Sequence, residues 1–322
     1  MPRPLILAAL LSAVFQFPLA AAEPTPRRPK NDEELRFWLD NMLVHHRFSA
    51  EEAAAATGLS AAEVTAAAER WKIDPAKAPA RAEGAPLLVL PYPGGRHPRI
   101  GFLDGAVDPQ RETKVSVFAP WKDGGYAVAD VPEAIWMEIP GGRELLYLAH
   151  THVATHWTKQ GVTLEPLEWR AIEDCWQMER TLPNKVAFGA RVTPQREGVK
   201  MEMWLTNGRA TPLKGLVVQN CVMLKGLAGF AQQTNDNKLF RAPLVACSSA
   251  DKTRWIITAW TPNHRTWGNA PCPCLHSDPK FPDCEPGKTV RLRGWLSFYE
   301  GADIEGELTR LGKLDWLQQP SK

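Results

Sequence analysis

The segment VTPQREGVKMEMWLTNGRATPLKGLVVQNCV, residues 192–222, decides the fold class of this 322-residue chain. Its central run, VKMEMWLTN, alternates apolar and polar side chains, which is the two-residue period of a strand with one buried face. One face carries Val199, Met201, Met203 and Leu205, and the opposite face carries Lys200, Glu202, Trp204 and Thr206. The turn-forming stretches QREG and TNGRA bound the run, so we predict a strand within an antiparallel sheet.

The same alternation returns near the end of the chain. There the apolar face carries Val290, Leu292, Leu296 and Phe298, opposite Arg291, Arg293, Trp295 and Tyr299. Between residues 87 and 310, short β-rich runs such as KVSVFAP, KVAFGARVT and RWIITAW are separated by turns such as KDGG and LPN. Many strands at hairpin spacing, with few helices, are typical of a mainly β protein, an antiparallel sandwich or barrel.

The succession of strand, turn, alternating strand ending in LTN, PL and a further strand in residues 192–222 resembles the galactose mutarotase-like supersandwich of sugar epimerases and other carbohydrate enzymes. This resemblance implies a large two-layer antiparallel β-sandwich with a concave face of sugar size. It implies a carbohydrate substrate only by analogy, because the family's catalytic residues do not align onto this chain position by position. The whole chain is also similar to exported bacterial proteins of unassigned activity.

The first 30 residues have the features of a secretory leader. Arg3 precedes an apolar run at residues 5–19, and three alanines follow at 20–22. This run is shorter than the roughly 20 residues that a membrane-spanning helix needs, so we predict a signal peptide cleaved near Ala22 and export to the periplasm or the extracellular space. An uncleaved anchor is the alternative. Residues 23–30, EPTPRRPK, are predicted to form a disordered leader.

Residues 31–73 are predicted to form a small unit of three helices. Asn31 or Asp32 is a candidate cap of the first helix, and Ser49 and Ser60 each precede a glutamate by three positions, which is the spacing of a capping box. The stretch FSAEEAAAATGLSAAEVTAAAERWKI within this unit resembles a helix-turn-helix of DNA-binding proteins.

The charge of the chain argues against nucleic acid as the partner of these helices. The net charge is only +2, and the second helix of the pair lacks a basic face. We therefore interpret the helices as a docking unit for a protein partner. The Ala- and Pro-rich residues 74–86 are predicted to link it to a sandwich domain at 87–322.

The motif AHTHVATHW follows a predicted strand and is the first candidate site. Alternate residues of a strand face the same way, so His150 and His152 can point together, and His156 can return from the following turn. Three histidines fit an open zinc site, and they also suit copper or non-haem iron. The alternatives are a metal-free sugar cleft in which one histidine is the general acid or base, and ordinary structural histidines.

The stretch PCPCLHSDPKFPDC, residues 271–284, is the second candidate site. In an extended segment its alternate residues share one face; these are Cys272, Cys274, His276 and Asp278. Because exported thiols usually oxidise, we predict a disulfide-held loop in which Cys284 closes onto Cys272 or Cys274 and carries His276 and Asp278 towards the histidine cluster. A thiolate metal site is the alternative.

Polar and aromatic loop residues complete the predicted site. Thirteen tryptophans is a high number for this length, and tryptophan faces stack on the apolar faces of sugars. The candidate substrate-binding residues are Trp157, Asn235, Asp236, Asn237, Arg241, His264, Trp267, His276 and Asp278. Glu300, at the end of a late strand, is the candidate acid or base beside the histidines.

Three functions remain open on these observations. The first is an exported protein that binds or processes a carbohydrate, as an epimerase, lyase or hydrolase if it is an enzyme, at a His-rich site with one divalent metal at most. The second is a non-catalytic module that binds glycan or protein, which predicts exposed coplanar tryptophans. The third is a periplasmic copper- or zinc-binding protein, which predicts that histidine and free cysteine thiols converge. The ligand is predicted to be a carbohydrate or another small polar molecule, without nucleic acid or a membrane span.

Overall fold

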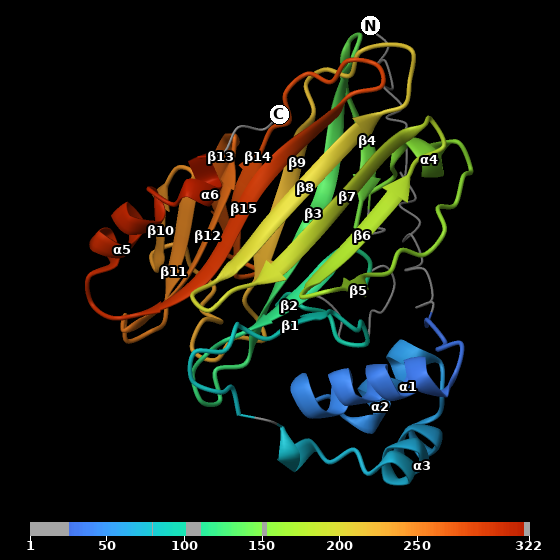
Figure 1. The fold of residues 1–322 in the computed structure, drawn as a ribbon, viewed down its shortest axis with the longest axis vertical. Coiled ribbons are helices and arrows are strands. Elements are labelled where there is room, and N and C mark those ends of the chain that lie inside the picture. The colour runs from blue at the N-terminus through green and yellow to red at the C-terminus, as the bar shows by residue number, and fades with distance from the viewer. Residues whose placement is uncertain (1–25, 79, 101–110, 150–152, 319–322) are drawn as a thin grey trace, which may run out of the picture.

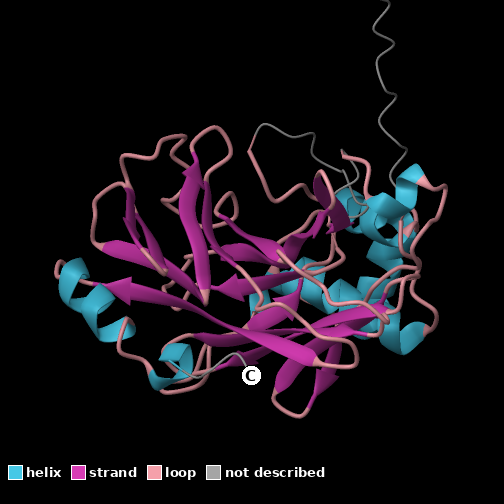
Figure 2. Cartoon of the chain, turned by 90° about the horizontal axis from the view of Figure 1, so that it is seen from above, coloured by secondary structure: helices cyan, strands magenta, loops and turns pink. Residues whose placement is uncertain are grey.

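The computed structural model describes residues 26–78, 80–100, 111–149 and 153–318. Two large antiparallel sheets face each other, and short helices lie at their ends (Figures 1 and 2). The predicted class, a mainly β antiparallel sandwich preceded by N-terminal helices, is therefore confirmed. The predicted signal peptide lies outside the described residues.

The first sheet has the strand order β1-β2-β3-β9-β14-β13, and β4 also pairs with β3. These strands are β1 Val89–Pro91, β2 Lys114–Phe118, β3 Tyr126–Ile139, β4 Gly142–Leu148, β9 Val217–Met223, β13 Asn263–Asn269 and β14 Cys274–Pro279. The register of β3 against β9 shifts between Asp130 and Ala134. This irregularity brings Glu133 beside Gln219 of β9, whose amide donates to the carboxylate over 2.7 Å.

The second sheet has the order β10-β11-β12-β15-β8-β7-β6-β5. Its strands are β5 Arg170–Ile172, β6 Cys175–Thr181, β7 Val186–Pro194, β8 Val199–Asn207, β10 Lys238–Arg241, β11 Leu244–Ser248, β12 Arg254–Thr261 and β15 Thr289–Glu300. The alternation read from the sequence sets the inner face of β8. Val199, Met201, Met203 and Leu205 are almost wholly buried and belong to the main apolar core.

The N-terminal helices are α1 Asp32–Leu39, η1 Asp40–His45, α2 Ala50–Thr57, α3 Ala61–Trp71 and η2 Pro75–Lys77. Asn31 caps α1, and Ser49 and Ser60 form capping boxes, as their spacing predicts. Gly58 ends α2 with a positive φ of 71°, a conformation that glycine adopts without steric cost.

These helices pack against the outer face of the first sheet where β3 and β14 begin and β9 ends. Their apolar side chains, among them Trp38, Leu39 and Met42, share one buried cluster with Tyr126 and Met223 of the sheet. Polar contacts fix the junction: the Asn41 amide donates to the Pro91 carbonyl over 3.0 Å, and the Arg96 guanidinium forms a fork on Glu52 with two contacts of 2.6 Å. Most side chains of β3, β9 and β14 are buried, whichever face of the sheet they are on.

The remaining helices are α4 His156–Lys159, α5 Ile304–Leu311 and α6 Asp315–Gln318. Helices α5 and α6 cover the outer face of the second sheet at β11, β12 and the adjoining part of β15, where Trp255 and Trp295 pack against Leu308 and Leu311. Among the helices of the described residues, none combines the length and apolar composition needed to cross a bilayer.

Of the leader predicted for residues 23–30, the structure describes residues 26–30, and Arg27 contacts the rest of the chain. The Arg27 backbone amide donates to the Ala56 carbonyl over 3.0 Å, and its guanidinium pairs with Glu112 and Glu168. Composition predicted disorder because the segment is rich in proline and charge. It could not show that buried carboxylates elsewhere in the chain need this arginine as a partner.

His46 lies buried between the helices and the sheet and is expected to make unfolding pH-dependent. Its Nδ1 lies 3.0 Å from the Asn41 carbonyl and its Nε2 lies 2.6 Å from the Ser116 hydroxyl, which suits a neutral ring. Burial lowers the pKa of His46 from 6.5 to about 3. Stability from the neutral ring is therefore complete above pH 6.5 and is lost as the pH falls towards 3, by up to about 4–5 kcal/mol.

We expect the free-energy cost of His46→Gln, measured by urea unfolding, to shrink as the pH is lowered from 7 to 4. The exposed His264 is the control, because His264→Gln should show no such dependence. A cost of His46→Gln that stays constant over this range would contradict the assignment of a neutral, buried ring.

Candidate functional site

The candidate site is built on the outer face of the first sheet by strands β9 and β14. In β9, Val218 and Val222 point into the core between the sheets, so Cys221 points outward. In β14, Leu275 points inward and Cys274 points outward. The same period places His276 and Asp278 on the outward face, as the sequence predicted for an extended segment.

Strand pairing aligns polar side chains in one row across five strands. Lys114 of β2 lies opposite Asp130 of β3, which lies opposite Cys221 of β9. On the other side His276 of β14 lies opposite Trp267 of β13. The pairing of Leu275 with Val222 sets Cys221 and His276 beside each other in the same row. A β9 cysteine thus meets a β14 histidine although 55 positions separate them in the chain.

Three of these side chains have the chemistry and the spacing of metal ligands. The Sγ atoms of Cys221 and Cys274 and one ring nitrogen of His276 all lie within 4.8 Å of one another. The three residues are 0%, 1% and 2% exposed. Two thiols and an imidazole are ligands preferred by zinc and copper, and their burial leaves little water to satisfy them.

Asp278 lies beside the histidine and binds the residues that pack on it. Its Oδ1 accepts from the Asn220 backbone amide over 3.1 Å and lies 3.7 Å from His276 Nδ1. Its Oδ2 accepts from Trp267 Nε1 and from Arg265 Nε, each over 2.7 Å. The Trp267 ring stacks on the His276 ring at 3.7 Å with a 13° tilt. These contacts hold the imidazole in one plane, whereas its Nδ1 has no partner in hydrogen-bonding geometry.

Burial and neighbouring charge shift the protonation of the thiol and the imidazole. Burial, together with hydrogen bonding to Cys274, raises the pKa of the Cys221 thiol well above its ordinary value. Burial by itself would lower the pKa of His276, but interaction with Cys221 and Asp278 outweighs it and raises the pKa to about 10. Without a cation the pair therefore retains its protons at neutral pH, and a bound metal would have to displace them.

A second group of donors shares Cys221 but is occupied by protein cations. Asp130, Glu133 and Cys221 also lie within 4.8 Å of one another. Lys114 Nζ lies 2.7 Å from Asp130, and the Arg99 guanidinium pairs with Glu133. Since each carboxylate already has a cationic partner, we assign the metal-ligand role to the thiol and imidazole group.

The one histidine of the predicted cluster that the structure describes, His156, lies apart from the site of Cys221, Cys274 and His276. His150 and His152 lie outside the described residues. His156 begins α4, where its Nδ1 contacts Glu144 and its Nε2 lies 3.1 Å from the Gln160 amide. Trp157 is buried and donates to the Leu146 carbonyl over 2.8 Å, which is a core position.

Of the other predicted residues, only Trp267, His276 and Asp278 come together. Asn235 donates to the Gly268 carbonyl of β13 over 3.2 Å, and Asn237 contacts Gln232 over 3.3 Å, so these side chains hold the loop before β10 in place. The remaining predicted positions are exposed, and two of them form surface ion pairs. They are Asp236, His264, Arg241 with Glu305 at 3.3 Å, and Glu300 with Arg254 at 2.9 Å.

The predicted disulfide between Cys284 and Cys272 or Cys274 is not formed. The six cysteines lie within the described residues, and each is a free thiol. Cys284 belongs to the core between the sheets, where its Sγ lies 3.2 Å from the Lys288 carbonyl oxygen. Cys272 and Cys274 instead belong to the cluster on the outer face of the first sheet. The sheet itself separates the two groups, a barrier that sequence spacing does not reveal.

The sequence reasoning missed Cys221, Asp130 and Glu133 as site residues. The available signal was weak: Cys221 follows the polar pair QN within an otherwise apolar strand, and Asp130 interrupts the run AVADVPEAIW. Such residues become informative only when strand order and register are known.

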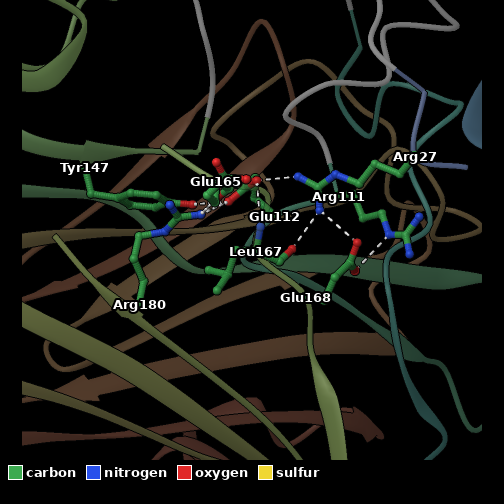
Figure 3. A network of polar contacts seen from close by, with 8 residues as sticks. All are labelled: Arg27, Arg111, Glu112, Tyr147, Glu165, Leu167, Glu168 and Arg180. Atoms are coloured by element: carbon green, nitrogen blue, oxygen red, sulfur yellow. Dashed lines mark hydrogen bonds and ion pairs between the residues drawn. The ribbon is translucent and has the colours of Figure 1, made fainter. Parts of the chain in front are cut away.

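A second buried polar network joins Arg27 near the N-terminus to the sandwich around Glu112 (Figure 3). Its Oε2 accepts from Arg180 over 3.1 Å and from the Tyr147 hydroxyl over 3.2 Å, and its Oε1 accepts from Arg27 and from the Leu167 amide. Burial and the Glu112 charge raise the pKa of Tyr147, so the phenol remains a donor. With four donors around one carboxylate, we interpret this network as structural.

Comparisons with known proteins return only distant structural likenesses. No protein-family model matches the chain, and no curated protein does. Solved structures that it resembles include a putative kojibiose phosphorylase from the human microbiome, with 7% identity and a TM-score of 0.28 over 45% of this chain and 20% of that one. The chain thus spans a fifth of that phosphorylase.

Two further similar structures come from bacteria. A putative mutarotase (YeaD) from Salmonella typhimurium has 11% identity and a TM-score of 0.32 over 58% of this chain and 87% of that one. A heparan sulfate lyase HepC mutant from Pedobacter heparinus has 12% identity and a TM-score of 0.32 over 86% of this chain and 44% of that one. Mutarotase-like structures are thus among the neighbours, as the resemblance implied. At these values the likeness carries no argument about function, which has to rest on the residues.

Removing the Glu112 charge is expected to destabilise the fold strongly. Glu112→Gln leaves the largely buried Arg180 without its carboxylate and leaves Arg27 with Glu168 alone, and breaking a buried ion pair from one side costs about 3–5 kcal/mol. We expect a loss of this size in the free energy of unfolding. The control Glu305→Gln removes an exposed pair with Arg241 and should change it by less than about 1 kcal/mol. Equal effects would refute a structural role for the network.

Proposed function

We propose that this protein binds one thiophilic metal ion through Cys221, Cys274 and His276. The observation that carries the proposal is the convergence of these donors within 4.8 Å, all of them buried, from two neighbouring strands. Two free thiols beside an imidazole are the arrangement that the metal-binding alternative required. The ligand set differs from the predicted one, because Cys221 replaces the histidines of the AHTHVATHW motif.

Charge favours a divalent ion, and zinc first. Two thiolates and one neutral imidazole around a divalent cation make a site without net charge, which lowers the cost of burying it. Zinc takes such nitrogen and sulfur ligands in tetrahedral sites, and three protein ligands leave a fourth position for another donor. Asp278 would hold the imidazole from outside the ligand shell, as carboxylates commonly do for metal-bound histidines.

The other candidate functions have less support from the described residues. A glycan platform requires exposed tryptophans, but each of the thirteen, all within the described residues, is buried or half-buried. The loop residues predicted to bind a sugar do not come together in one site. Carbohydrate processing, a metal at His150, His152 and His156, and export therefore remain proposals from the sequence.

The experiment is elemental analysis of the purified protein after dialysis against zinc or copper. We expect about one ion per chain in the wild type, and loss of most of it in Cys221→Ser, Cys274→Ser and His276→Gln. The control is Cys247→Ser, which removes an equally buried thiol in the second sheet. Cobalt substitution adds a readout independent of folding losses, because thiolate ligation gives an absorption band that should weaken in each single cysteine variant.

Two results would overturn the proposal. The first is wild-type protein without bound metal whose free-thiol count is two lower than the six cysteines, since Cys221 and Cys274 would then be oxidised to each other. The second is metal that remains in all three ligand variants, which would place the ion elsewhere in the chain.

A further inference from the structure

The outer face of the second sheet carries a row of charged and polar side chains that the metal site does not use. Register places Arg170 of β5 opposite Gln177 of β6, and Gln177 opposite Arg191 of β7. The row continues through Glu202 of β8 to Arg293 of β15. Because side chains in one row of a sheet point to one side, these five residues line a single face.

Positive charge dominates this face. Its strand residues include five cationic side chains, Arg170, Arg191, Lys200, Arg291 and Arg293, against two carboxylates, Glu179 and Glu202. The net charge of the entire chain is only +2. A local excess of this size means that the positive charge is concentrated here, while the rest of the chain is close to neutral.

Three of these cations have no carboxylate partner among the described residues. Arg191 directs its Nε and Nη2 to the Gln177 side-chain oxygen over 3.1 and 2.8 Å, which leaves its charge uncompensated. Arg170 is exposed and makes no ion pair, and Lys200 Nζ lies 5.4 Å above the Trp316 ring. In contrast, Glu202 is shared by Arg291 and Arg293.

The spacing of the row selects the kind of anion. Neighbouring strands lie about 4.8 Å apart, so Arg170 and Arg191, separated by one strand, lie roughly 10 Å apart. A linear polysaccharide with a carboxylate on every second sugar presents its charges at about the length of one disaccharide. Nucleic acid has denser charge, with a phosphate every 3.4 Å or so along each strand of a duplex.

We propose that this outer face of β5 to β8 and β15 binds an acidic polysaccharide that runs across the strands. The carboxylates of the polymer pair with Arg170 and Arg191, and Lys200 adds positive charge in the neighbouring row of the face. The proposal is independent of the metal ion, because the two sites lie on different sheets and share no residue.

The test measures binding of the full mature chain to immobilised hyaluronan, whose carboxylates recur once per disaccharide, with neutral dextran as the uncharged probe. We expect binding to hyaluronan only, weakening as salt screens the charges. The double variant Arg170→Gln, Arg191→Gln should bind at least about tenfold more weakly, which is about 1.4 kcal/mol for two charge contacts.

Matched controls distinguish an effect of the row on binding from an effect of overall charge or of misfolding. Arg254→Gln removes an exposed arginine of the same sheet that is paired with Glu300, and it should leave binding unchanged. Arg191→Lys keeps the charge and should retain most of the binding. Both positions of the double variant are exposed, so its thermal midpoint should equal that of the wild type.

Three results would overturn the proposal. The first is absence of hyaluronan binding at low salt. The second is equal loss in Arg254→Gln and in the double variant. The third is tighter binding to single-stranded DNA or to vesicles of anionic lipid than to hyaluronan, which would assign the face to a nucleic acid or a membrane surface instead.

Discussion

The central strands of the first sheet are buried on both faces, and this constraint governs the rest of the structure. One face packs on the second sheet, and the N-terminal helices cover part of the other, so most side chains on β3, β9 and β14 are buried whichever way they point. Burial of apolar side chains stabilises the fold. Polar ones must find partners inside the protein, because an unpaired buried polar group costs free energy. The outward row from Lys114 to Trp267 is the consequence.

In and beside that row, each buried carboxylate has a cationic partner. Lys114 offsets Asp130, Arg99 offsets Glu133, and Arg265 offsets Asp278. The Cys274 thiol donates instead to the Cys272 carbonyl oxygen over 2.6 Å, and the Nδ1 of His276 lies 3.7 Å from Asp278. Because these neighbours are a neutral carbonyl and an anion, we assign Cys221, Cys274 and His276, rather than the nearby carboxylates, to a cation from outside the chain.

The sequence predicted those features that depend on short-range periodicity. Alternation in residues 199–207 predicted the inner face of β8, and the capping spacing after Ser49 and Ser60 predicted the starts of α2 and α3. Both patterns span only a few residues. The alternation of Cys274, His276 and Asp278 was also visible. Their partner Cys221 was not, because the contact depends on β9 lying beside β14, and strand order is set by the packing of the whole chain. The disulfide prediction failed for the same reason.

The Glu112 network has a consequence for how the chain folds. Its donors Arg27 and Arg180 lie 85 and 68 positions away from the carboxylate, on opposite sides of it in the sequence. The carboxylate therefore lacks its full set of partners until the N-terminal arm (residues 26–30) and the segment around Arg180 have both packed against it. Contacts of such separation slow folding, because long loops must close before the contacts stabilise anything. Helices, sandwich and N-terminal arm should accordingly form and melt as one cooperative unit.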